Sequence, residues 1–140
     1  MFNLRKRIKK RIESRIGEFC YHELEKVEVK KKVGLFNYKC FHNACEYASS
    51  RNGCEVVMGI YINKRDNHPS LHFWCRDKNG KDLEVSMGYL AECYSYYEIR
   101  VIKVYDYFII DGVFEDAMEY YRNKLTTKWE RFILGKDRIL

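Results

Sequence analysis

Apolar side chains recur at steps of four along residues 4–20. Residues at this spacing share one face of an α-helix, so the pattern predicts an amphipathic helix. Most of the other positions in the segment are basic. We therefore expect a helix that docks on the rest of the protein through one face and leaves a basic surface in solvent. The apolar stripe consists of Leu4, Ile8, Ile12, Ile16 and Cys20.

A second helix is predicted from about Tyr38 to Asn52, because Asn37 can cap its N-terminus and Gly53 follows its last turn. Cys40 then lies in the first turn, where free backbone N–H groups and the helix dipole favour a thiolate. A structural cysteine sits more often on the apolar stripe of a helix. That stripe is formed here by Phe41, Ala44, Cys45 and Ala48.

The middle of the chain changes to strand-like patterns. Residues 55–63 are almost entirely apolar, which is typical of a strand buried on both faces, and Gly59 within it allows a neighbour to pack closely. After a polar loop, further strands are predicted at about 70–77, 81–87 and 96–105.

The last part of the chain is again helical in pattern, with Asp111 as a candidate cap and an apolar stripe that starts at Phe114. The order of elements predicts a single α+β domain over residues 1–140, with an antiparallel sheet of about four strands. N-terminal, cysteine-bearing and C-terminal helices would pack on this sheet. The three parts are a basic helical segment (1–32), a helix with the sheet (33–105) and a C-terminal helix (111–135).

The turn after the second strand decides which side chains share a face. The sequence from Asp77 to Gly80 favours a type I turn followed by a left-handed glycine, which gives a three-residue hairpin loop. In this register every apolar residue opposes another one, Arg76 opposes Asp82, and His72 and Glu84 are diagonal neighbours on one face. A two-residue turn would place His72 and Glu84 on opposite faces.

Composition narrows the choice of function. The net charge of +6 belongs to residues 1–32, because residues 33–140 contain 15 basic and 15 acidic residues. A neutral body argues against a protein built throughout for nucleic acid. The chain has no apolar run long enough for a membrane span, and no secretion signal is recognisable. Its six scattered cysteines favour a reduced, cytoplasmic protein.

Cys40, His72 and Glu84 are candidates for a catalytic triad. A thiol needs a base to become a nucleophile, an imidazole near neutral pH is such a base, and a carboxylate fixes its tautomer. Trp74 would shield the pair of His72 and Glu84 from water. Asn37 can also be read as a helix cap only.

The order of these motifs resembles papain-like and transglutaminase-like cysteine enzymes over about residues 36–104, and more narrowly small bacterial and phage-type proteins with the same order of groups. The chain departs from them in having Glu84 where Asp is common and Phe41 directly after the cysteine. The motifs are Cys40-x-x-Asn43-Ala44, His72-Phe73-Trp74 and Glu84-x-Ser86-x-Gly88.

The resemblance implies a papain-like fold and thioester chemistry on an amide bond, either proteolysis, deamidation or acyl transfer. Cys40 would attack, His72 would move the proton, and Glu84 would orient the imidazole. The Cys40 N–H, with Asn37 or Asn43, would stabilise the oxyanion, although Asn43 can equally be a packing residue. The expected substrate is a protein or peptide, and we expect no cofactor and no metal.

A non-enzymatic alternative is an accessory protein of a phage or mobile element. It would bind nucleic acid or an acidic partner through the basic helix, at Arg5, Lys6, Lys9, Lys10 and Arg11. A zinc site formed by Cys40, His42, Cys45, His72 and Cys75 is a weaker alternative, because structural zinc sites prefer closely paired cysteines at loop knuckles.

Overall fold

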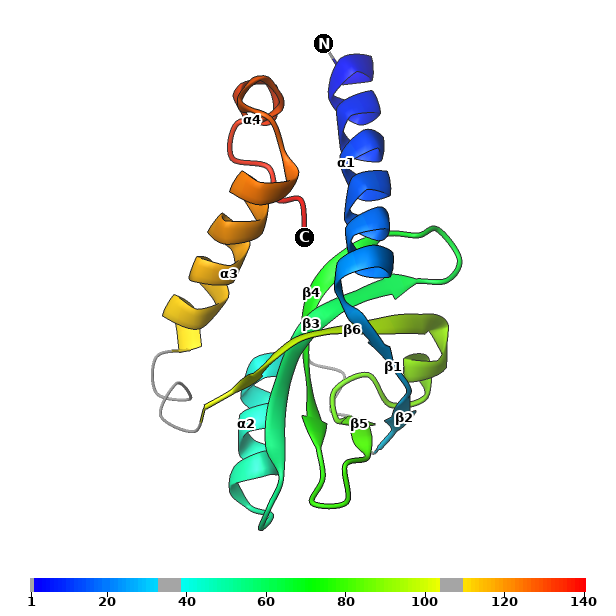
Figure 1. Cartoon of the computed structure of the whole chain (residues 1–140), viewed down its shortest axis with the longest axis vertical. Helices are drawn as coiled ribbons and strands as arrows, with labels where there is room; N and C mark the ends of the chain where they lie inside the picture. The colour runs from blue at the N-terminus through cyan, green and yellow to red at the C-terminus, as the bar shows by residue number, and fades with distance from the viewer. Residues whose placement is uncertain (1, 33–38, 104–109) are drawn as a thin grey trace.

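The computed structural model describes residues 2–32, 39–103 and 110–140 and shows helices packed on a strongly curled sheet (Figure 1). The helices are α1 (Phe2–Glu23), α2 (Cys40–Ser49), α3 (Ile110–Leu125) and α4 (Lys128–Leu134), with a 3₁₀ helix η1 (Gly88–Cys93). The strands are β1 (Glu25–Val27), β2 (Val29–Lys31), β3 (Glu55–Asn63), β4 (Pro69–Arg76), β5 (Asp82–Glu84) and β6 (Tyr94–Ile102). The α+β class predicted from the sequence is confirmed.

The sheet differs from the four antiparallel strands that we expected. It has six strands in the order β1-β6-β3-β4-β5-β2, and β2 runs parallel to β5. Only Glu28 separates β1 from β2, although these strands lie at opposite edges of the sheet. The sheet must therefore curl until one short segment of chain can reach both edges. Both strands are three residues long and mostly polar, so they lack the alternation that marks a strand in sequence.

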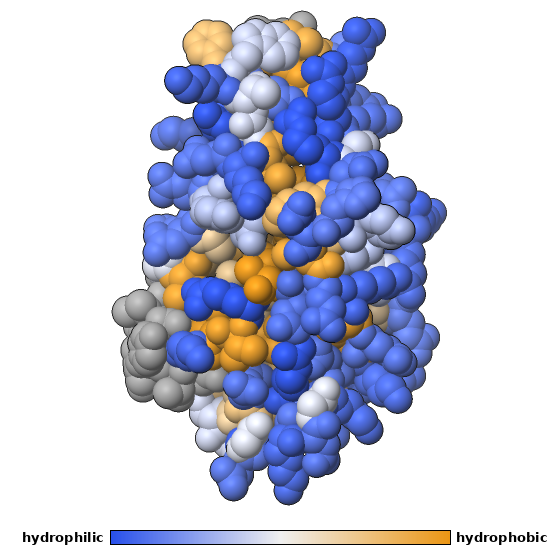
Figure 2. Space-filling view, viewed as in Figure 1, coloured by the Kyte–Doolittle hydropathy of each residue, from blue (hydrophilic) through white to orange (hydrophobic). Residues whose placement is uncertain are grey.

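The two faces of the sheet carry different cores. On the outer face, residues such as Met58 of β3 and Phe73 of β4 join the buried stripes of α1, α2 and α3 in one large cluster. Figure 2 shows hydrophobic residues along the middle of one side of the molecule, where α1 and α3 flank the sheet in Figure 1. On the inner face of the curl, Val57, Trp74 and Tyr96 form a second, smaller core.

Helix α1 docks as its stripe predicts, with Ile8, Ile12, Ile16 and Cys20 buried. One of its basic residues is used to pack α1 against α4. Arg15 forms a two-pronged bond with the buried Glu130 of α4, at 2.7 and 3.2 Å, and therefore belongs to the helix packing.

The C-terminal region that we predicted to be helical, residues 111–135, forms two helices. Helix α3 begins at Ile110 and already includes Asp111, the residue that we predicted to precede it. The chain breaks before α4 because Thr127 and Glu130 form a capping box: the Thr127 side chain accepts from the Glu130 N–H, and the Glu130 carboxylate accepts from the Thr127 N–H.

The hairpin between β4 and β5 has the predicted register. Cys75 pairs with Leu83 and Arg76 with Asp82, and the Asp77 carbonyl accepts the Gly80 N–H at 3.0 Å. Gly80 has a φ of 79°, as the left-handed position requires. Strand β5 ends at Glu84 and does not reach residue 87 as we expected. The reason is local: the Ser86 N–H donates to the Glu84 side chain, at 3.1 Å.

Candidate active site

Cys40 is the first residue of α2 and is half-buried. The residue before it, Lys39, occupies the N-cap position without a capping side chain, so the helix begins two residues later than we predicted. Asn37, the predicted cap and oxyanion donor, lies outside the described residues. Phe41 fixes the start of the helix on the sheet by packing edge-on against Phe73, with ring centroids 4.6 Å apart. The thiol thus stands at the positive end of a helix that is anchored on β4.

His72 and Glu84 are joined directly. His72 Nε2 lies 2.6 Å from Glu84 Oε1, which is the contact that the hairpin register predicted. Their exposed fractions are 2% for His72 and 0% for Glu84, so water does not compete for this bond. A hydrogen bond between a buried imidazole and a buried carboxylate is stronger than the same bond in solvent.

Both oxygens of Glu84 are held by further donors. The Tyr96 hydroxyl donates to Oε1 at 2.7 Å, and the Ser86 backbone N–H donates to Oε2 at 3.1 Å. Burial alone would raise the pKa of Glu84, but the charge and hydrogen bond of His72, together with these donors, lower it. The carboxylate is therefore held ionised.

The imidazole of His72 lies between this carboxylate and the thiol of Cys40. Burial alone would lower its pKa, but Glu84 and a hydrogen bond with Cys40 raise the pKa of His72 to about 9. Since Glu84 occupies Nε2, Nδ1 is the ring nitrogen that remains for the thiol. The structure thus brings the three predicted residues together, from α2, β4 and β5.

The face of the His72 ring is also held by an aromatic stack. Tyr61 of β3 stacks on it with centroids 4.1 Å apart and an interplanar angle of 3°, and Tyr94 stacks on the other face of Tyr61 at 4.0 Å. Burial raises the pKa of the Tyr61 hydroxyl above its usual value, and electrostatic interactions with Tyr94, Cys40 and Glu84 raise it further. A stacked ring keeps the imidazole in one orientation.

Asn43 and Trp74 lie beside Cys40, His72 and Glu84, and each donates a hydrogen bond to another residue. The Asn43 side-chain amide donates to Ser86 Oγ at 3.0 Å, which ties α2 to the segment that follows Glu84. The Trp74 ring is fully buried with its centroid 6.4 Å from that of His72, and its Nε1–H donates to Asp82 Oδ2 at 3.1 Å. Trp74 thus lies beside His72, where we predicted that it would shield His72 and Glu84 from water.

Sequence reasoning missed the tyrosines. Tyr61 could have been found from the β3–β4 register, in which Gly59 faces His72 and Tyr61 is the next inward residue. Tyr96 could not, because β6 lies two strands away from β4 in the sheet and reaches Glu84 only across the inside of the curl.

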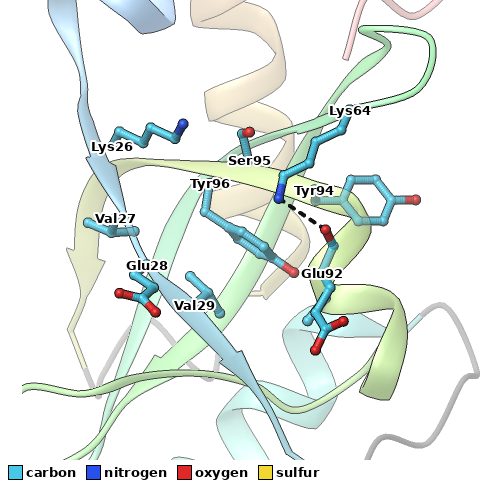
Figure 3. Close-up of a pocket in the computed structure, with 10 residues that line it drawn as sticks. Lys26, Val27, Glu28, Val29, Lys64, Glu92, Tyr94, Ser95 and Tyr96 are labelled. Atoms are coloured by element: carbon cyan, nitrogen blue, oxygen red, sulfur yellow. Dashed lines mark hydrogen bonds between the residues drawn. The ribbon is translucent and has the colours of Figure 1, made fainter.

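A cavity of about 470 Å³ opens beside Tyr94 and Tyr96, along the seam between β6 and the segment from β1 to β2 (Figure 3). Its rim carries two lysines and two glutamates, and Lys64 Nζ donates to the Glu92 carbonyl at 3.0 Å. We call it the seam cavity. It is lined by Lys26, Val27, Glu28, Val29, Lys64, Ala91, Glu92, Tyr94, Ser95 and Tyr96.

The zinc alternative is not supported by these positions. Cys75 faces the outer core and its thiol donates to the Ala44 carbonyl, whereas His72 faces the inside of the curl. Within residues 2–32, 39–103 and 110–140, no group of three or more potential metal-binding side chains comes together. His42 is exposed, and His68 bonds to Glu13 at 2.9 Å.

The basic residues predicted to bind a partner differ in their surroundings. Arg5 and Lys9 pair with Asp137, Arg5 at 2.5 Å and Lys9 at 3.1 Å. Lys6, Lys10 and Arg11 are exposed. In the described part of the chain, no helix has the length and hydrophobicity needed to cross a membrane.

Comparison with known proteins finds no family model, no curated protein and no solved structure that matches this chain. The geometry of the site is therefore the basis for its function.

Proposed function

We propose that the protein is a cysteine hydrolase or acyltransferase that acts on an amide bond through Cys40, His72 and Glu84. The observation that carries the proposal is the position of the His72 imidazole, which is bonded to an ionised, buried carboxylate on one side and reaches the Cys40 thiol on the other. A nucleophile, a base and a group that orients the base are the minimum for such chemistry.

In the first half of the reaction, His72 holds a proton as the imidazolium, in line with its raised pKa, while the Cys40 sulfur attacks the carbonyl carbon. The C–N bond breaks as His72 gives this proton to the leaving amine, which leaves a thioester on Cys40. Glu84 stays ionised throughout and stabilises the imidazolium. The free N–H groups in the first turn of α2, which begins at Cys40, would donate to the oxyanion.

In the second half, water or another amine attacks the thioester and gives up a proton to His72, and the sulfur leaves as the thiolate. Water gives hydrolysis, whereas an amine gives acyl transfer. The substrate is a protein or peptide that can bring a carbonyl group to the start of α2.

The proposal is tested by trapping the acyl intermediate. With 4-nitrophenyl acetate, Cys40 should become acetylated while 4-nitrophenolate is released, and mass spectrometry of peptides locates the acetyl group. We expect rapid acetylation of Cys40 in the natural protein and in a His42→Gln control, and none above background in His72→Gln or Cys40→Ser. Acetylation spread equally over the cysteines would contradict the proposal.

A second candidate function is binding of nucleic acid by α1, because Lys6, Lys10 and Arg11 remain exposed within about two turns of the helix. Replacing these three residues with Gln should then weaken salt-dependent binding of a fluorescent DNA duplex, as measured by anisotropy. The matched variant Arg5→Gln removes a cation that is already paired with Asp137 and should have little effect. Equal binding by the triple variant would contradict this function.

A further inference from the structure

Glu84 accepts two hydrogen bonds on one oxygen. Both His72 Nε2, at 2.6 Å, and the Tyr96 hydroxyl, at 2.7 Å, bond to Oε1. Oε2 accepts from the Ser86 N–H instead. The oxygen that orients the imidazole is therefore itself oriented by a tyrosine.

Tyr96 is placed for this bond by the curl of the sheet. It lies on β6, whereas Glu84 lies on β5, and β3 and β4 separate these strands. The hydroxyl reaches the carboxylate across the inside of the curl, where the Tyr96 ring packs edge-on against Trp74 with centroids 5.2 Å apart. Only 2% of Tyr96 is exposed, although one side of its ring lines the seam cavity. This burial leaves the hydroxyl with Glu84 as its partner.

We propose that Tyr96 is a positioning residue of the triad: its hydroxyl holds Glu84 in the ionised form and in the orientation that leaves His72 Nδ1 for Cys40. The inference rests on the proposed function and identifies the residue that regulates the ionisation of the same site. It predicts an effect on the pH range in which the site works, which a tyrosine that only fills space would not have.

The other groups around Glu84 do not replace this donor. On β4 and β3 they are His72, which is already bonded to Oε1, and Tyr61, which stacks on His72. Cys40 of α2 faces the imidazole, and Cys75 of β4 lies on the outer face of the sheet. Lys32, directly after β2, donates its backbone N–H to the Glu84 backbone carbonyl, and the side chains of Lys31 and Lys32 are exposed.

The direction of the effect follows from the charge. A donor to a carboxylate stabilises the ionised form, so its removal raises the pKa of Glu84. Once Glu84 is protonated, it can no longer stabilise the His72 imidazolium. The acid limb of Cys40 reactivity should therefore move to higher pH when the hydroxyl is removed.

The test compares Tyr96→Phe with Tyr97→Phe. Both variants remove one hydroxyl from adjacent residues of β6, but Tyr97 packs on the outer core and is remote from Glu84. Two readouts are used: the titration of the Glu84 carboxyl carbon by NMR in protein labelled with ¹³C-glutamate, and the rate of Cys40 alkylation by iodoacetamide against pH.

In Tyr96→Phe we expect both midpoints to rise by about one pH unit, the size of one charge-assisted hydrogen bond. In Tyr97→Phe they should coincide with those of the natural protein. An unchanged Glu84 titration in a folded Tyr96→Phe protein would overturn the inference. The NMR readout needs no reactive thiol, so a shifted titration beside a Cys40 that reacts no faster than Cys93 would uphold the role of Tyr96 and reject the proposed function instead.

Discussion

Gly59 of β3 lies directly opposite His72 of β4, and the missing side chain makes room for the site. A Cβ atom at Gly59 would lie 2.3 Å from the Trp74 ring and 2.2 Å from the Tyr97 carbonyl oxygen. Both distances are well below van der Waals contact. The close packing that the sequence suggested at this glycine is thus confirmed, and its purpose is to let Trp74 lie beneath the strand.

Gly59→Ala should destabilise the protein by about 2–3 kcal/mol, because neither the backbone carbonyl nor the buried indole can move away freely. Urea unfolding followed by circular dichroism measures the loss. Gly17→Ala is the matched control: its Cβ would meet nothing within 4 Å, and it should stabilise α1 by about 0.5–1 kcal/mol. Equal effects of the two changes would contradict the packing described here.

Glu84→Gln should reduce stability by about 2–4 kcal/mol, because it removes a buried charge from its partner and leaves His72 and Tyr96 with a weaker acceptor. Denaturant unfolding gives the value. Glu46→Gln on the exposed side of α2 makes the same chemical change and should stay within about 0.5 kcal/mol of the natural protein. A mild effect at Glu84 would show that the carboxylate is not ionised in the fold.

The stability contributed by the pair should depend on pH in a defined direction. The pKa of His72 is raised from 6.5 in the unfolded chain to about 9, so its contribution is complete below pH 6.5 and is lost as the pH rises through about 9. The pKa of Glu84 is lowered from 4.5, so its contribution is complete above that pH and is lost as the pH falls further.

The unfolding free energy of the natural protein minus that of His72→Gln should therefore be largest between pH 4.5 and pH 6.5 and should fall towards pH 9. Taking the difference removes the titration of the other groups, including Cys20 and Cys45, whose pKa values are raised to about 12 by burial. A difference that does not change with pH would mean that folding does not shift the pKa of His72, and a difference that rises with pH would mean that His72 is neutral in the fold.

Arg15→Ala should cost about 2 kcal/mol or more, because it leaves the buried Glu130 carboxylate without its cation. Arg11→Ala removes an exposed arginine from the same helix and should change the unfolding free energy by less than about 0.5 kcal/mol. Equal losses at the two positions would indicate that the bond between α1 and α4 does not stabilise the fold.

Local patterns predicted much of this structure. The stripe of α1, the buried strand β3 and the β4–β5 register all follow from neighbouring residues, since Asp77 and Gly80 fix the turn and the turn fixes which side chains meet. The meeting of His72 and Glu84 could be derived in this way.

Contacts between distant segments could not be derived. Strands β1 and β2 are short and polar, and they exist because they bridge the edges of a sheet whose curl is a property of the whole domain. The bond from Tyr96 to Glu84 depends on the same curl. The exact boundary between α3 and α4 is hard to read from the sequence for a different reason: the Thr127–Glu130 capping box lies inside an apolar pattern that continues across it.

Activation of Cys40 by His72 can be measured as the rate of alkylation of each cysteine near neutral pH. Iodoacetamide with peptide mass mapping resolves Cys40 from the exposed Cys93 and from the buried Cys20 and Cys75. We predict that Cys40 reacts more than about tenfold faster than Cys93 and that this advantage disappears in His72→Ala but persists in His42→Ala. A Cys40 that reacts no faster than Cys93, or equally fast without His72, would contradict the account.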